Sequence, residues 1–251
     1  MRIILSPAKQ MISNTDILDY SGLPVFLDRA EEILSYLRGL SYEEAKKLWT
    51  CNDKLARLNY ERLFYMELRR GLTPAILSYD GIAFKYMAPA VFEYGQFDYV
   101  QEHLRILSGF YGVLKPMDGV TPCRLEMQAK AKVGQAKNLY EYWGERLYRE
   151  VLDESRLIVN LASKEYSRCI EKYLAPEDRF LTCVFGEPEG DRVVQKGVYA
   201  KMARGEMVRF MAEQRIEEPE EMKRFGRLGY RFDPGRSETE RYVFIRGREE
   251  D

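Results

Sequence analysis

Side chains able to do chemistry are concentrated between residues 105 and 127. This segment holds the cations Arg105, Lys115 and Arg124, the carboxylates Asp118 and Glu126, and the glycines Gly109 and Gly112. Glycine lets backbone N–H groups approach a phosphate without a clash with a Cβ atom, and Arg and Lys are common partners of phosphate oxygens. These three cations and two glycines are therefore candidates for a phosphate-binding turn. The alternative is a helix that ends at glycine, followed by a tight turn, with the two arginines paired to the two carboxylates in a buried network.

Two further candidate groups follow predicted strands. Lys9 comes after the apolar run Arg2–Ser6, and Asn160 and Ser163 lie at the end of the run Arg156–Leu161. Ligands in open α/β sheets favour the carboxyl ends of strands, and the free N–H groups of a helix N-terminus suit an anion. If the two strands are neighbours, we expect Lys9, Asn160 and Ser163 to converge on one pocket. The alternative is that Ser163 only caps a helix and that Lys9 is a solvated turn residue.

Two helices carry the remaining candidates. Asp53 lies at a helix start, where the helix dipole alone explains a carboxylate, and a catalytic role is the alternative. Lys201 and Arg204 flank the apolar face of a helix predicted over 201–214, and such charges are either solvated or bound to phosphate. The candidate catalytic residues are Lys9, Asp53 and Ser163. The candidate DNA or phosphate contacts are Lys9, Arg105, Gly109, Gly112, Lys115, Arg124, Asn160, Ser163, Lys201 and Arg204.

Strand and helix patterns alternate along the chain. The patterns predict strands over 2–6, 74–79, 156–161, 180–185, 192–196 and 242–245. Helices are predicted over 24–37, after the caps Ser41, Asn52, Asn138 and Ser163, and over 98–109 and 201–214. This order favours an α/β chain of the mixed α+β kind, with a mixed β-sheet wrapped by helices. Because no linker or repeat interrupts it, we expect one domain over 1–251.

Composition excludes several kinds of site. Lys plus Arg (39) almost balance Asp plus Glu (40), so binding to nucleic acid would need a local cluster of cations. His103 is the only histidine, and Val100 stands where a di-iron helix carries Glu, so a ferritin-like iron store is not expected. The four cysteines are far apart, which suggests neither a metal site nor a disulfide. No run approaches the roughly 20 apolar residues of a membrane span. We expect a cytoplasmic monomer without metal, cofactor or membrane segment.

The motifs resemble those of a known family. Residues 105–118 and 122–127 are similar to the signature of the YaaA family, the bacterial peroxide-stress-resistance proteins. Four other stretches agree with it in the family's order: Leu5–Lys9, Asn52–Asn59, Asn160–Tyr166 and Tyr199–Gly205. With Gly229–Asp233, the resemblance covers essentially the whole chain. It implies a cytosolic protein that protects cells against hydrogen peroxide, keeps unincorporated iron low and limits damage to DNA and proteins. It also implies binding of double-stranded DNA through a basic cleft and a helix-hairpin-helix-like element, here Leu107–Gly112.

Two motifs depart from the family pattern. Where its members usually carry Gly-Asp-Val-Tyr, this chain has Gly81-Ile82-Ala83-Phe84, and Lys9 is followed by Gln10-Met11 in place of Thr-Leu. The acid and the phenolic hydroxyl of the first motif are missing, so no role of these groups transfers to this chain.

Two functions compete for the same residues. The first is a DNA-associated stress protein with a basic cleft that limits iron-dependent oxidative damage. The second is an enzyme that acts on a phosphorylated or nucleotide-like small molecule in a pocket lined by the same Lys, Arg, Ser and Asn residues. An open basic groove favours the first, and a pocket too narrow for a duplex favours the second.

Overall fold

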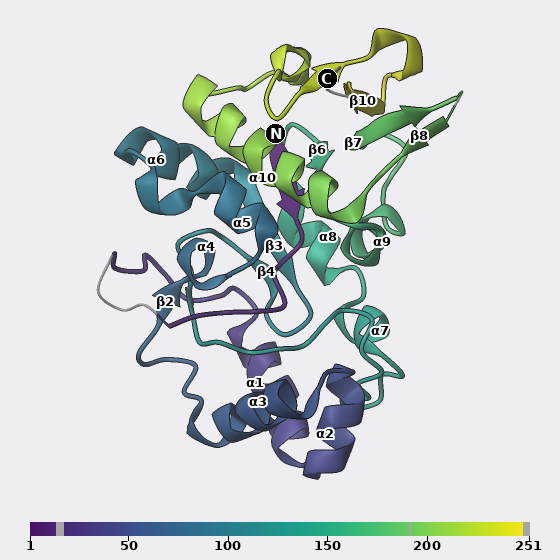
Figure 1. Cartoon of the computed structure of the whole chain (residues 1–251). Helices are drawn as coiled ribbons and strands as arrows, with labels where there is room; N and C mark the ends of the chain where they lie inside the picture. Colours follow the sequence, from purple (N-terminus) through teal and green to yellow (C-terminus); the bar gives the residue numbers. More distant parts are fainter. Residues whose placement is uncertain (14–17, 191, 248–251) are drawn as a thin grey trace.

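The first strand of the chain lies in the middle of the sheet. In the computed structural model, which describes residues 1–13, 18–190 and 192–247, β1 (Arg2–Leu5) lies between β3 (Leu104–Ser108) and β6 (Leu157–Asn160). It runs parallel to both neighbours (Figure 1). The carboxyl ends of these three strands therefore meet at one edge of the sheet.

Further strands extend the sheet on both sides. β7 (Arg179–Glu189) and β10 (Arg241–Arg246) continue the parallel part beyond β6. Three antiparallel strands flank it: β4 (Gly112–Leu114) on β3, β9 (Tyr230–Phe232) on β10, and β8 (Arg192–Val194) on the end of β7. A separate short pair joins β2 (Thr73–Pro74) to β5 (Gly119–Val120). The described residues thus form a mixed α/β fold on a main mixed sheet, as predicted.

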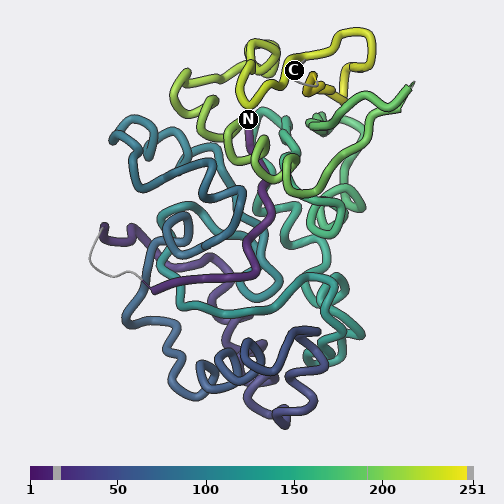
Figure 2. The backbone as a smooth tube through the Cα atoms, in the orientation of Figure 1, coloured from purple at the N-terminus to yellow at the C-terminus, as the bar shows by residue number. Residues whose placement is uncertain are grey.

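Helices pack around this sheet. In Figure 1, α10 (Gly197–Gln214) passes in front of the strands, and it packs on α5 (Ile82–Met87), α6 (Tyr94–His103) and β7. The short α8 (Arg146–Val151) packs on α9 (Lys164–Glu171) and β4, and α7 (Leu139–Trp143) precedes it. The helices α1 (Leu27–Arg38), α2 (Tyr42–Trp49) and α3 (Asp53–Tyr65) lie at the opposite end of the molecule from β9 and β10 (Figure 2). The described residues also form the short helix α4 (Ala75–Ser78) and the 3₁₀ turns Pro89–Val91, Pro219–Arg224 and Pro234–Arg236.

Local sequence signals explain several helix starts. Ser41 makes both hydrogen bonds of a capping box with Glu44, and the Asn52 side chain accepts from the Leu55 N–H at 3.0 Å. Asn138 caps α7 in the same way. A single apolar cluster then runs from Met1 to Phe244 and includes the sheet and residues of α1, α2 and α3. In the described ranges no helix is long and apolar enough to cross a membrane.

Two predicted elements are wrong. The helix expected over 98–109 ends at His103, and the chain continues as β3, which is buried along its whole length. A strand buried on both faces shows no alternation, so its apolar run resembles a helix segment. The strand expected over 74–79 is instead the short helix α4, because Pro74 has a φ suited to a helix start.

The expected helix-hairpin-helix element is also not present at Leu107–Gly112. Residues 109–111 turn between the antiparallel strands β3 and β4, in which Ser108 pairs with Gly112. The hairpin therefore connects two strands and not two helices. The Ser108 hydroxyl accepts the N–H groups of Phe110 and Tyr111 at 3.2 and 3.1 Å, which satisfies the backbone of the turn from within the protein.

Candidate functional site

A cavity of about 610 Å³ lies at the carboxyl ends of β1, β3 and β6. Its wall combines the loop after β1, the α2–α3 junction, the loop that leads into α5, residues 123–126, the start of α9 and one face of α10. We call it the central cavity. The chain passes from β1 to β3 on one side and later to β6 on the other, which makes this the kind of switch point where open α/β sheets bind ligands.

The neighbouring ends of β1 and β6 are joined by two serines. The Ser163 N–H donates to Ser6 Oγ at 2.8 Å, and Ser6 Oγ donates to Ser163 Oγ at 3.1 Å. Ser163 is the N-cap of α9, yet its side chain makes no capping hydrogen bond. Lys9 and Ser163 both line the central cavity, so the predicted convergence of these two residues is found.

Asn160 does not line the cavity. Its side-chain oxygen accepts the Ala162 N–H at 2.9 Å, and its amide donates to Thr182 Oγ1 at 3.3 Å. The residue is buried, with 4% of its surface exposed. Asn160 thus holds the turn after β6 in the shape that brings Ser163 to the cavity.

Four cations line the cavity, and two of them share one carboxylate. Glu126 binds Lys9 Nζ through Oε2 and Arg124 Nη2 through Oε1, both at 2.9 Å. The buried pair of Arg124 with Glu126 is one that the sequence suggested as the structural alternative. Lys201 and Arg204 contribute the other two cations from α10.

A second carboxylate in the wall has a perturbed acidity. Burial raises the pKa of Glu165 above its ordinary value, and the nearby charge of Glu126 adds to the effect. The Gln128 N–H donates to Glu165 Oε1 at 3.2 Å and opposes this shift in part. A carboxyl with a raised pKa in a cavity is a typical proton donor or acceptor.

The remaining wall is aromatic and apolar. Burial raises the pKa of Tyr79 and of Tyr166, so both phenols stay neutral, and the Tyr79 ring lies 5.2 Å from that of Phe84. Burial also raises the pKa of the Cys123 thiol, which therefore remains protonated and a poor nucleophile. Gly81-Ile82-Ala83-Phe84 line the cavity as well. The departure from the family pattern thus falls in this wall.

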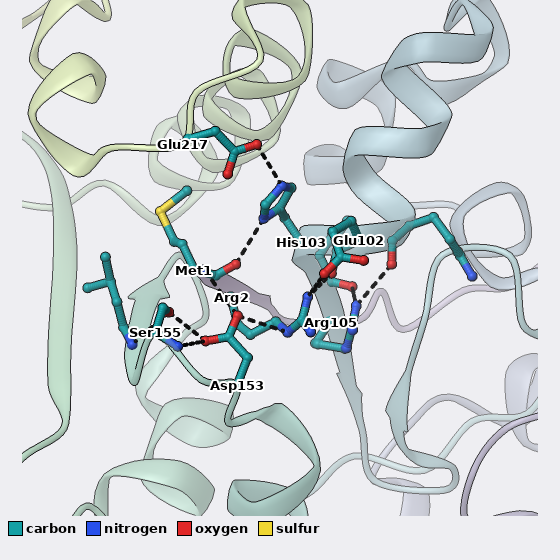
Figure 3. A network of polar contacts seen from close by, with 11 residues as sticks. Met1, Arg2, Glu102, His103, Arg105, Asp153, Ser155 and Glu217 are labelled. Atoms are coloured by element: carbon teal, nitrogen blue, oxygen red, sulfur yellow. Dashed lines mark hydrogen bonds and ion pairs between the residues drawn. The ribbon is translucent and has the colours of Figure 1, made fainter.

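Arg105 lies away from the cavity, inside a polar network (Figure 3). Its Nη1 donates to the carbonyl oxygens of Leu104 at 2.8 Å and Gln101 at 3.1 Å, and 4% of the residue is exposed. In the same network, Arg2 binds Glu102 at 2.7 Å and Asp153 at 3.4 Å. Arg105 is therefore not available to a phosphate in the cavity.

The two glycines of the same segment serve close packing. A Cβ atom on Gly109 would lie 2.5 Å from the carbonyl oxygen of Leu125. Gly112 has a φ of +79°, and a Cβ there would lie 2.9 Å from the Trp143 ring. Both are buried, so their N–H groups do not face an open groove. Lys115 is exposed but lies outside the cavity wall.

Asp118 gives the fold a dependence on pH. Burial raises its pKa to about 6, and the Lys115 N–H donates to Oδ2 at 2.8 Å. Folding favours the protonated carboxyl, so its stabilising contribution is complete below about pH 4 and lost as the pH rises to about 6. A pKa raised from 3.8 to about 6 corresponds to about 3 kcal/mol. We expect Asp118→Asn to remove this slope from the free energy of unfolding, measured in urea at pH 4, 5, 6 and 7; an unchanged slope contradicts the assignment.

Asp53 lies outside the cavity in an exposed cluster at the start of α3. It accepts from Tyr42 Oη at 2.6 Å and binds Arg57 at 2.8 Å and Lys46 at 2.9 Å. These hydrogen bonds lower its pKa, that from Tyr42 being the largest cause. The structure thus places Asp53 in a helix-start network and apart from Lys9 and Ser163.

Sequence reasoning missed several residues of the cavity. Ser6 belongs to the same motif as Lys9, and Glu165 follows Ser163 by two positions, so both motifs held a signal. Tyr79 and Ser108 gave none, because their place depends on how β3 and the loop before α5 meet. Within residues 1–13, 18–190 and 192–247, no group of three or more His, Cys, Asp or Glu residues is arranged to hold a metal ion.

Comparison with known proteins places the chain among bacterial relatives. The family described as "Peroxide stress protein YaaA" matches residues 1–236. A UPF0246 protein of Agathobacter rectalis is 62% identical over 246 residues, which cover 98% of this chain and 99% of the relative. UPF0246 proteins of Lachnoclostridium phytofermentans and Desulfitobacterium hafniense are 56% and 54% identical, and each match covers 98% of this chain with 97% and 98% of the relative.

Proposed function

Because the chain belongs to the peroxide stress protein YaaA family, we propose that it serves peroxide resistance as an enzyme acting on a phosphorylated or nucleotide-like small molecule in the central cavity. The observation that carries the proposal is the cavity itself. Its volume of about 610 Å³ falls in the usual range for sites of small ligands, roughly 300–1,000 Å³. Cations from three separate parts of the chain line it: the loop after β1, residues 123–126 and α10.

The same wall offers groups for both binding and proton transfer. Lys201 and Arg204 suit a phosphate, and the buried aromatic rings of Tyr79 and Tyr166 suit a planar ring. Glu165, with its raised pKa, is the candidate proton donor or acceptor. Lys9 and Ser163 remain candidate catalytic residues in this proposal, and Asp53 does not.

Binding of double-stranded DNA has less support as the finer function. A cavity of this volume does not admit a duplex, so DNA contacts would be confined to exposed lysines such as Lys9 and Lys201 at the cavity and Lys115 outside it. Arg105, Gly109 and Gly112, which the sequence offered as contacts, are buried. Any limitation of iron-dependent damage would then follow indirectly from what happens to the small molecule.

A titration of the purified protein against adenosine monophosphate and a 20-base-pair duplex tests the proposal. We expect calorimetry to show saturable binding of the mononucleotide, and chromatography to show its conversion into a product. The duplex should not displace the bound mononucleotide. Lys115→Ala is the control, since it removes an exposed cation outside the cavity and should leave mononucleotide binding unchanged. Salt-dependent binding of the duplex, reduced in the control variant, together with no binding of any nucleotide or phosphate ester, would favour DNA instead.

A further inference from the structure

The charges in the central cavity are divided unequally. Lys9 and Arg124 are both bound to Glu126 at 2.9 Å, so these two cations share one carboxylate as their partner. An incoming anion must compete with Glu126 for either of them. Lys9 and Arg124 are therefore less suited than an unpaired cation to bind an anionic ligand.

Arg204 differs from the other arginine of the cavity. It makes no hydrogen bond or ion pair with any residue that the structure describes, whereas Arg124 is paired with Glu126; the Nε atoms of both arginines are shielded from solvent without a partner. Burial lowers the pKa of the Arg204 guanidinium, and the group that opposes this shift is the Cys183 thiol. Burial raises the pKa of that thiol to about 12, so it is neutral and does not compensate the charge. Arg204 thus brings an uncompensated positive charge to the cavity wall.

The fold holds Arg204 in this position. The next residue, Gly205, lies so close to α5 that an added Cβ would be 1.9 Å from the carbonyl oxygen of Ala83. The helix α10 is therefore seated directly on α5, and the backbone at Arg204 has little freedom to carry the side chain into solvent. A half-buried guanidinium with a shielded Nε and no partner is costly, so keeping one in a cavity requires an explanation.

A second cation of the same helix lies one turn away. Lys201 precedes Arg204 by three residues, a spacing that places both side chains on one helix face, and both line the cavity. Lys201 is exposed, and it forms no ion pair with any described residue. A planar guanidinium with an adjacent ammonium is a common arrangement for holding a phosphate group.

Resting on the proposed function, we propose that Arg204 is the anchor for the phosphate group of a mononucleotide, with Lys201 as its second cation. The ligand anion supplies the compensating charge that the protein lacks at this point. The aromatic side chains Tyr79, Phe84 and Tyr166 belong to the same cavity and provide the surface for the base.

Arg204→Met tests the anchor, because it should lower the affinity for the ligand and raise the stability of the unliganded protein. The variant should weaken the binding of adenosine monophosphate about 10- to 100-fold, because a charge-assisted contact to phosphate is lost. It should also raise the Tm of the unliganded protein by about 2–4 °C, because an uncompensated charge is replaced by an apolar side chain of similar length. Ribose 5-phosphate should lose affinity in the same proportion as the mononucleotide, and adenosine should lose none.

Two matched variants separate this role from general loss of charge. Arg209→Met removes a guanidinium from the same helix, outside the cavity and paired with Glu213, and should leave the affinity unchanged. Lys9→Met removes a cavity cation that is already paired with Glu126, and should weaken binding less than Arg204→Met. A lower Tm with unchanged affinity in Arg204→Met would show that Arg204 has a structural role. That result would overturn the proposal that Arg204 anchors the phosphate, but not the proposed function. If the wild type binds neither adenosine monophosphate nor ribose 5-phosphate nor inorganic phosphate, the proposed function itself fails.

Discussion

Gly205→Ala is expected to lower the free energy of unfolding by at least about 3 kcal/mol. Alanine normally stabilises a helix interior by about 1 kcal/mol relative to glycine, so the expected change has the opposite sign from helix propensity. The reason is the 1.9 Å approach of an added Cβ to the carbonyl oxygen of Ala83, which is backbone and cannot rotate away. The helices α5 and α10 would have to separate, and with them the wall that carries Ala83 and Arg204.

The same substitution elsewhere in α10 provides the control. Gly197 is the first residue of the helix, and an added Cβ there meets no atom within 4 Å. Gly197→Ala should leave stability unchanged or raise it slightly. Urea unfolding followed by circular dichroism measures both variants, and equal midpoints for the two would contradict the packing described here.

Gly109→Ala is expected to cost about 2–3 kcal/mol of stability and to disturb the cavity as well. An added Cβ would lie 2.5 Å from the Leu125 carbonyl oxygen and 3.0 Å from the backbone at Glu126 and Met127. The loop that contains Leu125 also presents Arg124 and Glu126 to the cavity. We therefore expect the variant to lose affinity for the mononucleotide beyond what its lower stability explains.

The control for this variant is Gly226→Ala. Gly226 has one neighbour near the added Cβ, at 3.9 Å, and no unusual φ. Both proteins are compared at a temperature at which each is fully folded. If Gly109→Ala binds the mononucleotide as tightly as the wild type, residues 124–126 do not depend on this turn.

The position of the cavity could be predicted from the sequence, because strand ends carry their own signal. A short apolar run followed by Ser6 and Lys9, and a second followed by Asn160 and Ser163, led to the correct expectation that Lys9 and Ser163 share a pocket. The helical spacing of Lys201 and Arg204 placed both on one face of α10. These are local patterns, and they depend only on the neighbouring pairing of β1 with β6.

The segment 105–127 could not be interpreted from its sequence alone. Its glycines are required by contacts with Leu125 and Trp143, which lie 16 and 31 positions further along the chain, and not by a phosphate. Arg105 finds its acceptors in the carbonyl groups at the end of α6. Gly109, Gly112 and Arg105 therefore serve close packing and internal hydrogen bonds, whereas Arg124 of the same segment lines the central cavity.

Glu126 shows why charge alone does not identify a contact. In the sequence, Lys9 and Arg124 are equal to Arg204 as candidate phosphate ligands, yet both are paired with Glu126 across the cavity wall. Among the described residues Arg204 has no partner, and this is visible only in the folded chain, because it depends on which side chains distant segments bring to the cavity. The unpaired Arg204 is therefore a better candidate for a phosphate contact than the paired Lys9 and Arg124.

A crystal structure of the wild-type protein soaked with adenosine monophosphate would show whether Arg204 holds the phosphate of a nucleotide in the central cavity. We expect electron density for the nucleotide within the central cavity, with its phosphate against the guanidinium of Arg204. An empty cavity in a protein that binds the nucleotide in solution, with density for the ligand on the outer surface, would contradict it.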